Sequence, residues 1–243
     1  MKIFSIDSSG LVASVAVIED NQVISDYSIN YKKTHSQTLV PMLDEIKKMT
    51  EIDLNTIDAI AIAKGPGSFT GLRIGSATAK GLGLALNKPL IPVGTLEGLA
   101  MNMWGYDGLI CPIMDARREQ VYTGVFRFSD GNLETLINQQ PMGIEELIEK
   151  LNSDSELKSY GKVIFLGDGC PVYEDTIKAK MNIPYEFAPA HMNRQRAASL
   201  GVLAMKYYSE GKIESASEHK PDYLRLSQAE RERLEAMNNA DNS

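Results

Sequence analysis

Residues 60–86 read IAIAKGPGSFTGLRIGSATAKGLGLAL, and this stretch predicts a strand, a tight turn and a long helix in direct succession. The alternating isoleucines and alanines of residues 60–63 are typical of a buried strand. Residues 65–67, Gly-Pro-Gly, predict the turn, because glycine allows close backbone approach and proline stiffens a bend. Either Ser68 or Thr70 is a suitable N-cap for the helix that follows.

The turn admits two interpretations. Free backbone N–H groups at the start of the helix could cradle an anion such as a phosphate. The same residues could instead form a tight corner before a helix made for close packing. The helix is rich in glycine and alanine, and each glycine inside a helix costs about 1 kcal/mol relative to alanine. Several glycines together therefore suggest close approach by another backbone, from this chain or from a partner.

The composition excludes some classes of protein. The chain has 243 residues, 43% of them hydrophobic, which is enough for a core in one large domain or two lobes. Its net charge is −7, and an acidic protein binds nucleic acid poorly alone, because phosphate contacts supply most non-specific affinity. No apolar run approaches the ~20 residues that cross a bilayer. We expect a cytoplasmic protein with buried free thiols at Cys111 and Cys170.

The order of the predicted elements repeats. Each half reads strand, strand, strand, helix, strand, helix, and opens with an apolar strand that ends in Asp7 or Asp115. This order predicts a duplicated α/β fold. The predicted strands cover residues 2–7, 13–18, 22–29, 58–63, 89–93, 109–114, 120–128, 133–138 and 163–166, and the predicted helices cover residues 35–46, 68–86, 95–103, 144–151, 172–181 and 194–208.

The repeat also predicts the domain boundaries. We expect an N-terminal lobe over residues 1–106 and a C-terminal lobe over residues 107–226, which the helix at residues 194–208 would close. Residues 227–243 are expected to form a charged, partly disordered tail. A short helix at residues 230–237 is plausible within it.

The sequence resembles the TsaB family, also called YeaZ, over nearly its whole length. GPGSFTGLRIG followed by DARR is the most specific part of the match. The motifs that carry the resemblance are Ile6-Asp7-Ser8-Ser9, Ala13-Ser14-Val15-Ala16, His35-Ser36-Gln37, residues 65–75, Ala79-Lys80-Gly81-Leu82, Asp115-Ala116-Arg117-Arg118, Val121-Tyr122, Gly167-Asp168-Gly169 and Pro221-Asp222-Tyr223-Leu224-Arg225.

The resemblance implies a fold and a set of partners. It implies the two-lobed actin/sugar-kinase/Hsp70-like fold, with the βββαβα unit duplicated. The family is an interaction subunit that pairs with its catalytic paralogue TsaD, and the ATPase TsaE docks on that pair. In isolation the family forms homodimers, and tRNA is reached only through the complex. No cofactor is implied for the chain alone, although the family leaves room for ATP or ADP at the partner interface.

Kinases and ATPases of this fold grip phosphates with an Asp-x-Gly turn in each lobe. In this chain a serine and an arginine replace the glycines, and a Cβ or a guanidinium would crowd a phosphate. The aspartates could instead cap strand ends or pair with a nearby arginine, and residues 167–169 could contact an adenosine or form a plain turn. We therefore expect a degenerate nucleotide cleft formed by Asp7, Ser8, Ser9, Asp115, Arg117, Arg118, Gly167 and Gly169.

No metal site is expected. The paralogue TsaD holds a metal with an H-x-x-x-H pair, and Thr95 and Leu99 stand at the matching positions. Leucine cannot ligate a metal. The three histidines, His35, His191 and His219, are far apart in sequence and are expected on the surface or at a helix cap.

Two helices are the expected partner interface. The residues alone leave core packing and partner binding equally open, and the resemblance favours partner binding. Methionine suits such adaptable surfaces. The expected interface residues are Leu39, Met42, Leu43, Ile46, Gly71, Leu72, Arg73, Gly75, Thr78, Ala79 and Leu82.

The sequence thus predicts a subunit that lacks a complete active site and is not an enzyme on its own. It would activate TsaD, together with TsaE, for threonylcarbamoyl transfer to the adenosine 3′ of a tRNA anticodon. One alternative is a weak stand-alone nucleotide phosphohydrolase using Asp7 and Asp115, which the missing turn glycines disfavour. A peptidase is less favoured still, because no G-x-S-x-G motif is present and neither cysteine adjoins a histidine.

Overall fold

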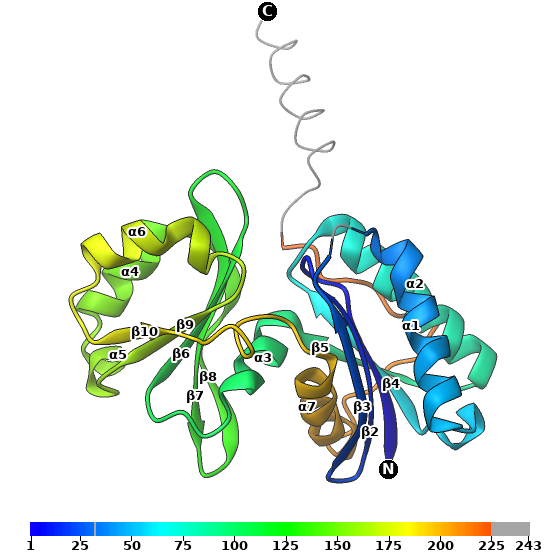
Figure 1. The fold of residues 1–243 in the computed structure, drawn as a ribbon. Coiled ribbons are helices and arrows are strands. Elements are labelled where there is room, and N and C mark those ends of the chain that lie inside the picture. The colour runs from blue at the N-terminus through cyan, green and yellow to red at the C-terminus, as the bar shows by residue number, and fades with distance from the viewer. Residues whose placement is uncertain (32, 225–243) are drawn as a thin grey trace, which may run out of the picture.

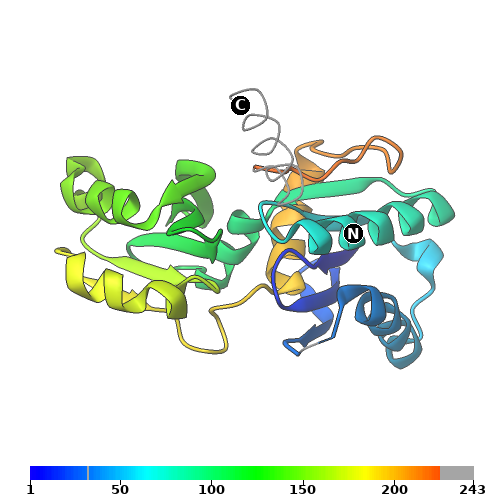
Figure 2. The same cartoon turned by 90° about the horizontal axis from the view of Figure 1, so that it is seen from above.

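The computed structural model describes residues 1–31 and 33–224. Two five-stranded sheets, one in each lobe, form the framework of the molecule (Figure 1). Seen from above, the lobes lie side by side and are joined at one end of the first sheet (Figure 2). The expectations for the tail at residues 227–243, including its helix, lie outside the described residues.

The first lobe is built on sheet A. Helices α1 (His35–Thr50) and α2 (Phe69–Leu86) cover one face of this sheet, and α3 (Thr95–Ala100) leads toward the second lobe (Figure 1). Short 3₁₀ turns, η1 (Leu54–Thr56) and η2 (Met101–Met103), lie before β4 and after α3. The strands of sheet A are β1 (Lys2–Asp7), β2 (Ala13–Glu19), β3 (Gln22–Ile29), β4 (Ala59–Gly65) and β5 (Leu90–Gly94).

The second lobe is built on sheet B, with α4 (Ile144–Ser153), α5 (Ser155–Ser159) and α6 (Cys170–Lys180) packed beside it. Sequence patterns did not reveal α5 or β10, because each spans too few residues to establish a period. Cys111 and Cys170 are buried free thiols, as expected. The strands of sheet B are β6 (Leu109–Asp115), β7 (Gln120–Ser129), β8 (Asn132–Gly143), β9 (Val163–Leu166) and β10 (Tyr185–Phe187).

The two sheets have the same topology. Sheet A has the order β3-β2-β1-β4-β5, and sheet B has the order β10-β9-β6-β7-β8. In each sheet the first strand of the lobe pairs antiparallel with the second and parallel with the fourth. This equivalence confirms the duplicated α/β fold that the order of elements predicted.

Helix α7 (Ala197–Ser209) is the main departure from the expected domain boundaries. It follows the second lobe in sequence but packs on sheet A, on the face opposite α1 and α2 (Figure 1). Leu200 and Leu203 share a buried cluster with Ile3 and Ile91. The helix therefore completes the first lobe rather than closing the second. The order of elements could not show this, because it does not say which sheet face is left uncovered.

The chain after α7 also returns to the first lobe. We call residues 213–224 the C-terminal strap, which runs beside α2 in Figures 1 and 2. Glu214 forms a β-bridge with Leu90 at the edge of sheet A. Farther along, the Asp222 N–H donates to the Lys64 carbonyl at 2.7 Å. The strap thereby joins the edge of sheet A to the turn before α2.

The glycines of α2 face two different environments. A methyl group at Gly71 would overlap the Ser8 carbonyl oxygen, and one at Gly75 would overlap the Ser8 hydroxyl. By contrast, no atom lies within 4 Å of the position that a methyl group at Gly81 would occupy. Much of the glycine pattern is therefore explained by close packing of α2 on the turn after β1 of the same chain.

This difference gives a matched pair of variants. We expect Gly71→Ala to lower the free energy of unfolding by about 1–3 kcal/mol, because the added methyl group meets rigid backbone. Gly81→Ala should raise it by about 0.5–1 kcal/mol, since alanine is the better helix former. Urea denaturation of both variants measures the two effects. Equal stabilisation by the two substitutions would contradict the close approach at Gly71.

Candidate functional site

The first expected phosphate turn is closed by its own hydrogen bonds. Asp7 is 2% exposed, and its Oδ1 accepts bonds from the Ser9 N–H at 2.9 Å and the Ser9 hydroxyl at 2.6 Å. Ser8 donates to the Gly71 carbonyl at 2.8 Å, and the Ser68 N–H donates to the Ser9 carbonyl at 2.7 Å. The turn is therefore tied to the start of α2, which favours the tight-corner interpretation of the glycine-rich stretch.

The environment of Asp7 disfavours its charged form. Burial raises the pKa of this carboxyl group to about 6, although the bonds from Ser9 and the nearby His35 act in the opposite direction. His35 Nε2 donates to the Gly10 carbonyl oxygen at 2.8 Å, and His35 is not the cap of α1, whose N-cap position is Thr34. The ring thus holds the turn after β1 rather than capping α1.

The second expected phosphate turn follows β6. Asp115 accepts bonds from the Arg117 N–H at 2.9 Å and from the Tyr173 hydroxyl at 3.1 Å. Its other oxygen lies 3.7 Å from Arg117 Nε, so the pairing of aspartate with arginine is one of the arrangements that the sequence left open. Arg117, Arg118 and Glu119 all have φ between 56° and 65°, in the left-handed region. Three consecutive left-handed residues therefore shape this turn, and the side chains of Arg117 and Arg118 are exposed on it.

The turn after β9 packs directly on β6. A methyl group at Gly167 would overlap the Ile113 carbonyl oxygen, and the Gly169 N–H donates to the same oxygen at 3.0 Å. The Asp168 carboxylate accepts from the Asp115 N–H at 3.2 Å, and burial raises the pKa of Asp168. The structure thus brings residues 167–169 and Asp115 together as a strand-to-helix corner.

Gln195 lies between the two turns. Its side chain is 2% exposed, packs against Gly10, and donates to Met114 Sδ at 3.6 Å. Gly10 follows the first turn and Met114 precedes Asp115, so the glutamine connects the ends of β1 and β6. Sequence analysis missed it, because a single glutamine in a loop before α7 belongs to no recognisable motif.

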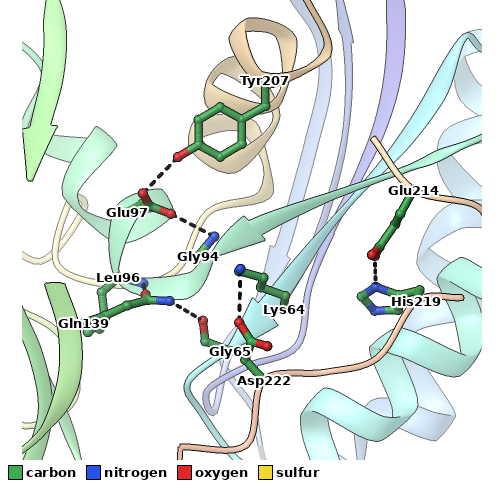
Figure 3. Close-up of polar contacts among 10 residues, drawn as sticks. All are labelled: Lys64, Gly65, Gly94, Leu96, Glu97, Gln139, Tyr207, Glu214, His219 and Asp222. Carbon is green, nitrogen blue, oxygen red and sulfur yellow. Dashed lines mark hydrogen bonds and ion pairs between the residues drawn. The ribbon is translucent and has the colours of Figure 1, made fainter. Parts of the chain in front are cut away.

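Polar contacts join the second lobe to the first near the end of β4 (Figure 3). Gln139 of β8 donates to the Gly65 carbonyl at 3.2 Å and accepts from the Leu96 N–H at 3.4 Å. Glu97 accepts from the Gly94 N–H at 3.1 Å and from the Tyr207 hydroxyl at 2.8 Å. These bonds fix α3, β8 and α7 relative to the end of β4.

A cavity of about 400 Å³ opens at this junction, but its charged groups have partners within the chain. Lys64 pairs with Asp222 at 3.0 Å, and Lys212 pairs with Glu210 at 2.7 Å. Glu214 pairs with His219, whose side chain is fully buried (Figure 3). The expectation of a surface or capping histidine is therefore wrong for His219, which anchors the strap. The cavity is lined by Lys64, Pro92, Glu97, Tyr207, Lys212, Ile213 and Glu214.

A groove on the first lobe has a different character. It lies between α1 and α2, measures about 440 Å³, and opens to solvent beside Val40, which is 59% exposed. Most of its lining is apolar. The residues that line it are Phe4, Val40, Leu43, Asp44, Lys47, Leu54, Ala77, Thr78, Gly81 and Leu82.

Comparisons with known proteins identify the family. The family model described as "TsaD: tRNA N6-adenosine threonylcarbamoyltransferase" matches residues 22–233. The protein named tRNA threonylcarbamoyladenosine biosynthesis protein TsaB from Bacillus subtilis (strain 168) is 33% identical over 239 residues, which cover 98% of this chain and 100% of the relative. The chain belongs to the TsaB family.

Further relatives agree with TsaB membership. The Escherichia coli (strain K12) protein of the same name is 28% identical over 231 residues, covering 93% of this chain and 95% of the relative. Among solved structures, YeaZ from Pseudomonas aeruginosa has a TM-score of 0.76 at 23% identity, covering 92% of this chain and 99% of that chain. This structural likeness concerns the fold, and it agrees with the expected two-lobed actin/sugar-kinase/Hsp70-like class.

The expected TsaB interface residues separate into two groups. Leu43, Thr78 and Leu82 line the groove, and Arg73 is exposed on the adjoining part of α2. The others are buried within this chain and do not line the groove. The interface assignment stays a prediction, now centred on the groove. The buried residues are Leu39, Met42, Ile46, Gly71, Leu72, Gly75 and Ala79.

The described residues offer no metal cluster and no activated thiol. No group of three histidine, cysteine, aspartate or glutamate side chains that could hold a metal occurs within residues 1–31 and 33–224. Thr95 and Leu99 are both buried on α3. Burial raises the pKa of the Cys111 and Cys170 thiols to about 12, so neither is a ready nucleophile at neutral pH. Within the same residues no helix is long and apolar enough to span a bilayer.

The raised pKa of Asp7 predicts a pH-dependent effect of Asp7→Asn. The ordinary pKa is 3.8 and the folded value is about 6, so ionising Asp7 costs stability increasingly as the pH rises from about 4 to 6. The cost is complete above pH 6. The variant should therefore gain up to about 3 kcal/mol of unfolding free energy between pH 4 and pH 8, relative to the parent protein.

Chemical denaturation at pH 4, 5, 6 and 8 measures this gain. Asparagine keeps an oxygen that can accept from Ser9, so the turn is retained. The matched control is Asp130→Asn, on an exposed hairpin turn outside the core. A gain that shrinks as the pH rises would contradict a buried carboxylate that resists ionisation.

Proposed function

We propose that this chain is the non-catalytic subunit for threonylcarbamoyl transfer to the adenosine 3′ of the anticodon in tRNAs. It acts by binding and activating TsaD, together with the ATPase TsaE. Membership of the TsaB family supports the pathway. The non-catalytic, partner-binding role is supported by a contrast. The first lobe has an apolar groove that is open to solvent, whereas the turns after β1 and β6 are closed by bonds within the chain.

The closed turns support a role without catalysis by this chain. A phosphate at the first turn would have to displace the bonds between Asp7 and Ser9 and part Ser8 from α2. At the second turn, the Asp115 oxygens are already engaged by Arg117 and Tyr173. No contact favours a nucleotide phosphohydrolase here, and the protonated thiols offer no support to a peptidase.

The groove supports binding to a helical partner. Its lining combines Val40, Leu43 and Leu82 with the small residues Ala77 and Gly81. Such a surface suits an amphipathic helix with apolar residues every three to four positions, because small residues let the helix backbones approach closely. TsaD is the partner that the family implies. The homodimer of the isolated chain would use the same groove and would therefore compete with TsaD.

The remaining parts of the proposal rest on the resemblance to the TsaB family. The chain requires no cofactor of its own, and any ATP or ADP is bound at the interface with the partner. The tRNA is held by the complex rather than by this acidic chain, and the complex works in the cytoplasm. Binding at α1 and α2 would stabilise the form of TsaD that is competent for transfer.

Two alanines on different helices provide the test. Ala77 of α2 lines the groove, whereas Ala179 is exposed on α6 of the second lobe. Ala77→Arg places a charged side chain in the apolar groove and should weaken binding to TsaD at least about 30-fold, equivalent to ~2 kcal/mol. Ala179→Arg should change the affinity less than about 2-fold, because it adds the same charge on the other lobe, away from the groove.

Isothermal titration calorimetry with TsaD from the same organism measures the affinity. A reconstituted assay of tRNA modification with TsaD and TsaE measures the activation. Both variants should unfold at the temperature of the parent protein. Normal pairing and normal activation by the Ala77→Arg variant would exclude the groove as the interface.

A further inference from the structure

Three side chains form a compact cluster at the start of α2. We call Phe69, Arg73 and Tyr223 the aromatic–arginine cluster. The Phe69 and Tyr223 ring centroids are 4.6 Å apart, and Arg73 Cζ lies 4.0 Å from the Phe69 centroid. Arg73 Nε donates to the Tyr223 hydroxyl at 3.3 Å. Phe69 of α2 and Tyr223 of the strap therefore contact the Arg73 guanidinium group, one through its ring face and the other through its hydroxyl.

The strap fixes Tyr223 in this position. Its neighbour Asp222 is bonded to Lys64 twice. The Asp222 N–H donates to the Lys64 carbonyl at 2.7 Å, and the two side chains form an ion pair at 3.0 Å, which Figure 3 shows. Farther back on the strap, Lys80 of α2 donates to the carbonyls of Ser217 and His219. The tyrosine is thus anchored to the end of β4 and to α2.

Arg73 keeps binding capacity after these contacts. It is exposed, and in the described part of the chain its two terminal amino groups make no hydrogen bond or ion pair. By comparison, Arg127 and Arg196 each face a carboxylate, at 2.6 and 2.9 Å. Stacking on Phe69 fixes the plane of the Arg73 guanidinium, which reduces the entropy lost when it binds a ligand. The two terminal amino groups of Arg73 lie side by side, so they can donate two parallel hydrogen bonds to one carboxylate.

The cluster adjoins the groove along α2. Arg73, Ala77 and Gly81 are spaced four residues apart, so they share one exposed face of the helix. Ala77, which lines the groove, is one helical turn from Arg73, about 6 Å along the axis. A helix lying in the groove alongside α2 therefore passes within reach of the guanidinium.

We propose that the aromatic–arginine cluster binds a carboxylate side chain of the protein that occupies the groove. It thereby selects a partner helix with an aspartate or glutamate at this end. This inference rests on the proposed function, because it needs the groove to be the interface. It goes further by assigning the charge of the partner and a role for the C-terminal strap in recognition.

A single carboxylate fits the cluster better than a nucleic acid does. Binding a polyanion depends on several cations acting together, and the chain carries a net charge of −7. Two lysines contact the strap and are already engaged by it. Lys80 of α2 donates to strap carbonyls, and Lys64 of β4 pairs with Asp222. Arg73 is the cation of the cluster, which suits one charge-assisted pair at a protein interface.

Charge variants at Arg73 test the inference. Arg73→Glu should weaken binding to TsaD at least about 10-fold, since two carboxylates would then face each other. Arg73→Lys keeps the charge but loses the stacked, two-bond geometry, and about a 5-fold loss is expected. Tyr223→Phe keeps the ring and removes the hydroxyl that orients Arg73, so it should cost about 2–3-fold. The control is Lys150→Glu on an exposed part of α4, which should leave the affinity unchanged.

Calorimetry with TsaD measures each affinity, and thermal unfolding checks that each variant remains folded. A second arm exchanges, one at a time, the carboxylates on the TsaD helix for lysine. One such exchange should restore binding to the Arg73→Glu variant and weaken binding to the parent chain. Failure of every exchange to do so would overturn the inference, because a merely structural role of Arg73 gives no such reciprocity.

The outcomes separate the two proposals. If Ala77→Arg abolishes pairing with TsaD and Arg73→Glu does not weaken it, the inferred contact between the cluster and a partner carboxylate is refuted, and the groove remains the interface. If neither variant weakens pairing, both proposals fail. If Arg73→Glu lowers binding of tRNA to the assembled complex while the affinity for TsaD is unchanged, the cluster contacts phosphate, which also refutes the inference.

Discussion

The close approach of α2 to the turn after β1 governs the arrangement of the first lobe. It is possible because Gly71 and Gly75 have no side chain, so Ser8 can lie directly against the helix and donate to its backbone. Asp7, which ends β1 just before this turn, is buried, and burial raises the pKa of its carboxyl group. A position that would face a phosphate in an open turn is thus used for internal packing. The consequence is a first lobe in which the turn after β1 is closed and α2 lies directly against it.

The orientation of α2 determines which surface remains for a partner. Because the Gly71 and Gly75 side faces the sheet, the opposite side shows Arg73, Ala77 and Gly81 to solvent. Helix α1 lies beside it, and together they leave the apolar groove. The C-terminal strap adds to the same surface by placing Tyr223 against Phe69. The packing of α2 therefore both closes the turn after β1 and leaves exposed the surface on which we expect the chain to function.

The sites were predictable to different degrees. The replacement of the two turn glycines by Ser9 and Arg117 is visible in the sequence, and the structure shows each turn engaged by its own chain. The side of α2 that carries the functional face was not visible, because glycine and alanine occur on both sides of the helix and give little amphipathic signal. Gln195, His219 and Tyr223 were not anticipated as contacts either. Each reaches its partner only after the chain has crossed from the second lobe back to the first.

The sequence by itself determined the duplicated order of strands and helices, the buried thiols and the strand-turn-helix at residues 60–86. These features follow from local periodicity, turn residues and capping, which act over a few positions. The tertiary structure alone decided that α7 and the strap belong to the first lobe. Sheet A has two apolar faces, and α1 and α2 cover only one of them. Covering the other requires a helix from more than a hundred residues away, and no local pattern specifies which helix that is.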